Sequence, residues 1–129
     1  MKLDEAKLID LRARAQALDE TIRGFDQQLE RGMLDSARHA ALITDYKRQR
    51  IAILMTLKQT VSGTDARIDE VLDDAIKGTG DPTEDSKKLR KVAEEKGLGT
   101  RILEAIDKNR GTIITWAIDI ALAIGKRVA

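Results

Sequence analysis

Residues 8–29, LIDLRARAQALDETIRGFDQQL, decide the fold of this chain. Within them, apolar residues recur at alternating spacings of three and four, at Leu8, Leu11, Ala15, Leu18, Ile22, Phe25 and Leu29. This is the spacing of a heptad seam, which keeps one side of a helix apolar along its whole length. We therefore predict one long helix over residues 3–31, about 40 Å long at a rise of 1.5 Å per residue.

A second long helix is expected directly after the first. Gly32 can end the first helix in the left-handed conformation, and Asp35 or Ser36 can cap the start of the next. That helix is expected to extend to Val61, and residues 51–55, IAILM, make it apolar nearly all round. Two helices of similar length with a short link predict an antiparallel, coiled-coil-like hairpin, which we assign to residues 1–62.

Arg50 interrupts the apolar stripe of this second helix. In an antiparallel hairpin it would lie near Gln16, Asp19 or Glu20, any of which could pair with it. A polar contact of this kind in a seam sets register or partner number rather than adding stability.

The remaining residues, 63–129, are divided by glycine-containing breaks. Thr64 can cap a helix that ends near residue 77, and Asp81 followed by Pro82 can begin another that ends near residue 96. Two more helices are expected over about residues 100–110 and 112–127. The predicted fold class is all-α, with a long N-terminal antiparallel helical hairpin packed against a bundle of about four shorter helices.

The composition limits the function classes. Charged residues make up 35% of the chain but leave a net charge of only +1, which is typical of solvated helix faces. Proteins that bind nucleic acid through phosphate contacts usually carry a clear basic excess. Phe25, Tyr46 and Trp116 are the only aromatic residues, so no stacking platform for single strands exists. Without cysteine the chain forms neither disulfides nor thiolate metal sites.

The sequence contains no recognisable catalytic constellation. His39 is the only histidine, which excludes a histidine-rich metal site or a pair of histidines for acid–base chemistry. It falls on the same helix face as Ile43 and Tyr46, which favours a packed or edge histidine. The acidic run at positions 69, 70, 73 and 74 lacks a partner motif, and we interpret it as a solvated face. We expect no enzyme activity, no cofactor and no metal.

One local pattern lies across the fourth and fifth expected helices, at residues 92–106, VAEEKGLGTRILEAI. It resembles the helix-turn-helix of bacterial regulators, in which an Ala and a Gly four residues later form the tight turn, as Ala93 and Gly97 would here. The resemblance implies that Thr100, Arg101 and Glu104 face the major groove of DNA. Lys96 and Gly99 depart from the pattern. A Gly-capped helix joined to a capped helix is the simpler interpretation.

The last expected helix is the most apolar segment, because ten of the twelve residues from 113 to 124 are hydrophobic. A helix that spans a bilayer needs about 20 apolar residues, which is more than this segment offers. We therefore predict a core or interface helix, with Trp116 buried. Asp119 should then lie at the edge of the core and pair with a Lys, an Arg or a helix N-terminus. The alternative is a helix that inserts into membranes.

These features predict a non-enzymatic module for protein–protein interaction or oligomerisation, with a second copy or another helical protein as partner. The alternatives are a helix-turn-helix DNA-binding regulator dimerised by the hairpin, and a membrane-active effector that uses the last helix. The charged start of the chain lacks an apolar leader, so we expect a cytoplasmic protein. The expected interface residues are Leu11, Leu18, Ile22, Phe25, Ile51 and Met55.

Overall fold

The computed structural model describes residues 3–128, and within them it contains six α-helices and no strand. The predicted all-α class is therefore confirmed. The helices are α1 (Glu5–Glu30), α2 (Ser36–Val61), α3 (Ala66–Lys77), α4 (Pro82–Glu95), α5 (Thr100–Asp107) and α6 (Ile113–Val128).

Aspartates cap the start of the first four helices, because a short carboxylate can accept a hydrogen bond from an otherwise unpaired backbone N–H. Asp35 accepts from Arg38 at 2.8 Å and Asp81 accepts from Thr83 at 2.9 Å, as the sequence predicts. The cap of α3 is Asp65 and not Thr64. Asp65 accepts hydrogen bonds from both the backbone and the side chain of Arg67, which hold its pKa below the ordinary value.

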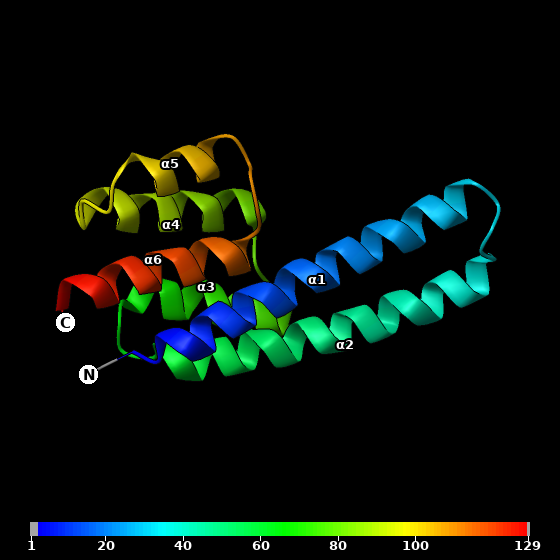
Figure 1. Cartoon of the computed structure of the whole chain (residues 1–129), viewed down its shortest axis with the longest axis horizontal. Coiled ribbons are helices and arrows are strands. Elements are labelled where there is room, and N and C mark those ends of the chain that lie inside the picture. Colours follow the sequence, from blue (N-terminus) through cyan, green and yellow to red (C-terminus); the bar gives the residue numbers. More distant parts are fainter. Residues whose placement is uncertain (1–2, 129) are drawn as a thin grey trace.

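Helices α1 and α2 lie side by side and run in opposite directions (Figure 1). The reversal occurs directly after α1, where Gly32 adopts a positive φ of 71° that glycine accommodates without strain. The amide of Met33 donates to the carbonyl of Gln28 at 2.8 Å, and that of Gly32 donates to Leu29 at 3.1 Å. These two bonds satisfy carbonyls at the end of α1 and turn the chain toward α2.

Only one end of this helix pair joins the protein core. Its buried residues are Leu8, Leu11, Ala15, Ile53, Leu54, Leu57 and Val61. Residues 16–52, which we call the distal arm, contain no fully buried residue and project beyond the other helices (Figure 1). The core includes residues on both sides of the boundary predicted between residues 62 and 63.

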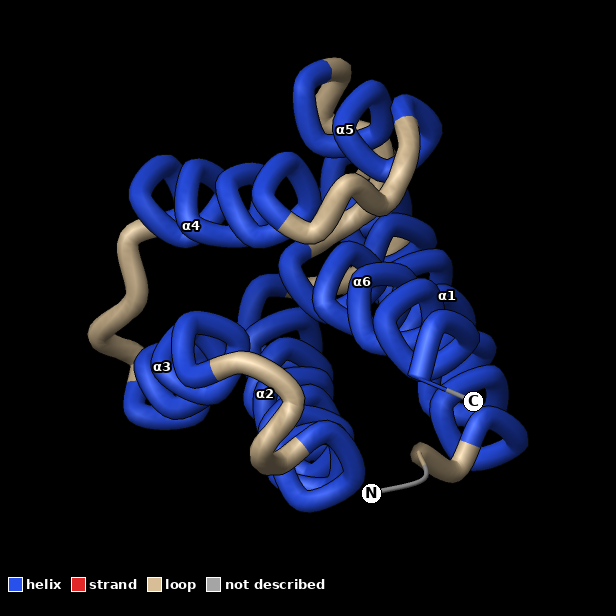
Figure 2. The backbone as a smooth tube through the Cα atoms, turned by 90° about the vertical axis from the view of Figure 1, so that its left-hand side faces the viewer, coloured by secondary structure: helices blue, strands red, loops and turns tan. Residues whose placement is uncertain are grey.

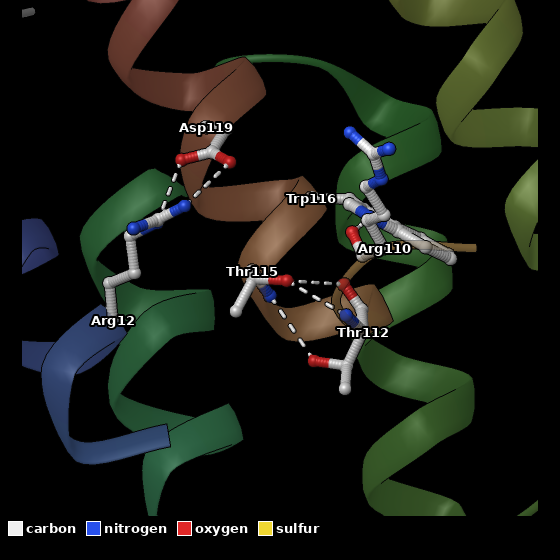
Figure 3. A network of polar contacts seen from close by, with 6 residues as sticks. All are labelled: Arg12, Arg110, Thr112, Thr115, Trp116 and Asp119. Atoms are coloured by element: carbon white, nitrogen blue, oxygen red, sulfur yellow. Dashed lines mark hydrogen bonds and ion pairs between the residues drawn. The ribbon is translucent and has the colours of Figure 1, made fainter. Parts of the chain in front are cut away.

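Helix α6 lies in the middle of the core and contacts α1, α2, α4 and α5 (Figure 2). Trp116 is only 4% exposed, and its indole N–H donates to the carbonyl of Arg110 at 2.8 Å. Asp119 is half-buried and faces Arg12 of α1, whose Nε lies 3.0 Å from Oδ1 (Figure 3). This is the placement expected of a core helix.

None of the helices within residues 3–128 combines the length and the apolar character that crossing a membrane requires.

Trp116→Ala tests the central place of α6. Removing this buried side chain should lower the free energy of unfolding by about 3–5 kcal/mol, through lost burial and the cavity left behind. Met33→Ala is the control, because Met33 is 71% exposed and its loss should change stability by less than about 0.5 kcal/mol. Urea unfolding followed by circular dichroism measures both. Equal losses in the two variants would contradict the assignment.

Candidate functional site

An apolar groove of about 630 Å³ runs between α1 and α2 on one side of the distal arm. On each helix the lining residues recur at spacings of three and four, so they share one face. Helix α1 contributes Arg14, Ala17, Leu18, Thr21, Ile22 and Phe25. Helix α2 contributes Leu42, Asp45, Tyr46, Gln49, Ala52, Ile53 and Thr56.

The two edges of the groove carry small side chains. Ala17 and Thr21 lie on the α1 side, and Ala52 and Thr56 lie on the α2 side. Both alanines are exposed to solvent. Small residues let the backbone of another helix approach closely, while Leu18, Ile22 and Phe25 supply bulk between the edges.

The polar groups of the groove already have partners inside the chain. The hydroxyls of Thr21 and Thr56 donate to the carbonyls of Ala17 at 2.9 Å and Ala52 at 3.1 Å. Gln49 donates to Asp45 at 2.7 Å. Covering the groove would leave these polar groups hydrogen-bonded, so the usual penalty for burying unpaired polar groups would be small.

The charged group at the proximal end is also paired. Arg14 forms an ion pair with Asp10 at 3.1 Å, one helical turn away. Both side chains are exposed, so this pair adds little stability. Its importance for the groove is that Arg14 does not present an unbalanced charge to a covering surface.

Tyr46 of α2 lines the groove and also forms a hydrogen bond to α1. Its hydroxyl donates to Asp19 of α1 at 3.2 Å. Burial and the nearby carboxylate of Asp19 raise the pKa of Tyr46 above its ordinary value, because both disfavour the phenolate. Farther along the arm, His39 and Asp26 form a second link at 2.7 Å. These two contacts hold α1 and α2 together where no other helix packs on them.

The structure divides the six interface residues expected from the sequence among three places. Leu18, Ile22 and Phe25 line the groove. Leu11 is fully buried in the core of its own chain, away from the groove.

The other two expected interface residues lie outside the groove. Ile51 and Met55 are 38% and 53% exposed and do not belong to its lining. Each lies two residues from Ile53 on α2, which places it on nearly the opposite side of the helix. Since Ile53 lines the groove, Ile51 and Met55 face away from it. Leu42 and Tyr46 line the groove but were not among the expected interface residues, although the lining positions 42, 46, 49, 53 and 56 of α2 follow the same three-and-four spacing as the α1 seam.

Arg50 forms no ion pair with its expected neighbours within residues 3–126. Asp19, which we expected near it, accepts its hydrogen bond from Tyr46.

The residues singled out by the helix-turn-helix resemblance lie on α5. Thr100, Arg101 and Glu104 are exposed, and Glu104 pairs with Lys108 at 2.5 Å. Arg101 and Glu104 line a second, polar cleft between α1, α5 and α6. The charges around this cleft are mixed in sign, from Arg12, Arg23, Arg101, Arg110 and Lys126 and from Asp19, Glu20, Glu104 and Asp119.

Two residues of the acidic run on α3 form ion pairs with neighbouring helices. Lys88 donates to Glu70 at 2.7 Å, and Lys58 pairs with Asp73. Within the described part of the chain, no group of three or more acidic or histidine side chains could hold a metal ion. His39, paired with Asp26, belongs to the arm described above.

Comparison of the chain with protein-family models, with curated proteins and with solved structures found no significant match.

The titration of Tyr46 tests the contact across the arm. Since its pKa is raised in the folded chain, Tyr46 contributes stability that is present below pH 10 and is lost as the pH rises through the folded-state pKa. Tyr46 is the only tyrosine, so phenolate absorbance reports this group alone. The midpoint should lie above 10.0 in the folded chain, and Asp19→Asn should lower it. Asp10→Asn is the control and should leave it unchanged. A folded-state midpoint at or below 10.0 would disprove the contact.

Proposed function

We propose that the chain is a non-enzymatic interaction module whose groove on the distal arm binds an apolar helix face, in the first instance that of a second copy. The observation that supports this most directly is an uncovered apolar groove whose polar lining groups are already hydrogen-bonded. When a partner displaces water from such a surface, little free energy is lost in desolvating polar groups. Burial of the apolar side chains then favours binding.

The dimensions of the groove define the kind of segment it fits. Its α1 side extends from Arg14 to Phe25, which corresponds to roughly 16 Å at 1.5 Å per residue. A partner helix of about three turns, with apolar residues on one face at spacings of three and four, matches this length. Binding of an amphipathic helix in a groove between two helices is a common mode of recognition between proteins.

Charge insertion at the edge of the groove tests the proposal. Ala17→Glu and Ala52→Glu place a carboxylate where a partner helix would lie, yet both positions are exposed in the single chain, so the fold should survive. An unpaired charge buried at an interface costs about 2–5 kcal/mol, so self-association should weaken by at least about 30-fold. Sedimentation velocity over a concentration series measures this change, and circular dichroism monitors the fold.

The matched controls are Ile51→Glu and Met55→Glu, which introduce the same charge on another face of α2. They should leave association unchanged. If they dissociate the oligomer and the groove variants do not, the interface lies on the Ile51 face. A wild-type chain that sediments as a monomer at every concentration tested would exclude self-association.

A further inference from the structure

Asp85 is the most deeply buried carboxylate among the residues that the structure describes, and it lies where α4 packs against α3. It is 3% exposed and belongs to the first turns of α4, where that helix packs against α3. Within residues 3–126 no hydrogen bond or ion pair reaches its side chain, although its backbone N–H donates to the carbonyl of Asp81 at 2.8 Å. An ionised carboxylate in this position is costly.

The turn before α4 is shaped around this carboxyl group. A Cβ atom on Gly80 would lie 2.8 Å from Oδ2 of Asp85, so only glycine fits at this position without a shift. The turn of residues 78–81 therefore rests directly on the side chain of Asp85. A change in the position of the carboxyl group would therefore alter its contact with Gly80, in the link between α3 and α4.

The charges that act on Asp85 are mostly of its own sign. Helix α3 contributes Glu70 and Asp74, and the turn contributes Asp81. An opposing charge comes from Lys88 of α4, whose ammonium group is already hydrogen-bonded to Glu70 at 2.7 Å. The N-terminus of α4 favours a carboxylate, but burial and three acidic neighbours act against it.

We propose that Asp85 is a proton-sensitive clasp between α3 and α4, closed when its carboxyl group is neutral and loosened when it ionises. A neutral carboxyl can donate a hydrogen bond to one of the neighbouring carboxylates, so one proton removes a repulsion and adds a bond. In the ionised form the repulsion is relieved by movement of the turn at residues 78–81 away from α4.

The sign of the pH dependence follows from the burial. Burial and the neighbouring acids raise the pKa of Asp85 above 3.8. The stabilising contribution is therefore fully present below pH 3.8 and is lost as the pH rises through the folded-state pKa. Because α4 also packs on α6, mild acid should stabilise the packing of α4 on α6 rather than weaken it.

Amide exchange and carboxyl titration of the full-length chain test the clasp. The side-chain carboxyl carbon of Asp85 should titrate above 3.8 by NMR. Each unit of upward shift should change the opening equilibrium of the turn about tenfold, seen as higher protection of the amides of residues 78–81 below the titration midpoint than above it.

Two substitutions separate the clasp from a merely buried side chain. Asp74→Asn removes one like charge, so it should lower the titration midpoint of Asp85 and raise protection of the turn at neutral pH. Asp85→Asn cannot ionise, so protection of the turn should no longer depend on pH. Glu30→Gln removes one exposed charge from the distal arm and should change neither quantity.

Three results would overturn the clasp. They are a midpoint for Asp85 at or below 3.8, turn protection that does not change with pH in the wild type, and an unchanged midpoint in Asp74→Asn. The last comparison does not require that Asp85→Asn fold. None of these readouts depends on self-association, so the clasp and the function proposed for the groove can fail separately.

Discussion

The need to bury the apolar side chains of α6 determines the arrangement of the other helices. Its residues from 114 to 121 are buried except Asp119, and α1, α2, α4 and α5 all contact it. Full burial of a side chain such as Ile118 or Ile120 contributes about 1.5–3 kcal/mol. A half-exposed ion pair such as Arg12–Asp119 contributes about 0–1 kcal/mol. Apolar burial therefore assembles the helices, and the ion pair adds one polar contact between α1 and α6.

The groove is a consequence of unequal helix lengths. Helix α6 has 16 residues, which span about 24 Å, whereas α1 and α2 have 26 residues each and span about 39 Å. The shorter helices therefore cover one end of the α1–α2 pair and leave the rest as two helices alone. Two helices cannot enclose their own apolar seam. The half-buried state of Leu18, Ile22 and Phe25, against the complete burial of Leu8 and Leu11, is the direct result.

The helices could be predicted from the sequence, but how much of the α1–α2 pair the shorter helices leave uncovered could not. The heptad spacing and the capping residues predict the helices because they act within a few residues of one another. The burial of Trp116 could be predicted because exposing a large apolar side chain to water is costly. The pairing of Asp119 could be predicted because burying an unpaired carboxylate is costly. The sequence could not predict that Leu11 is buried in the core whereas Ile22 lines the groove. Both residues belong to the same apolar seam, and their burial depends on how far the other helices extend along α1. The partner of Asp19 was missed because Tyr46 and Arg50, one turn apart on α2, both lie within reach of it in an antiparallel pair.

Polar groups have hydrogen-bond partners along the groove, whereas the side chain of Asp85 at the α3–α4 junction has none among the described residues. Along the groove, each threonine hydroxyl bonds to its own helix and Gln49 bonds to Asp45, so the surface can be covered without leaving a polar group unpaired. At the α3–α4 junction, Asp85 is covered by its own chain and has no partner, so its cost depends on its protonation state. A surface of the first kind responds to another molecule, whereas a group of the second kind responds to pH. The two lie on different helices, and what they share is the core around α6 against which α1, α2 and α4 are packed.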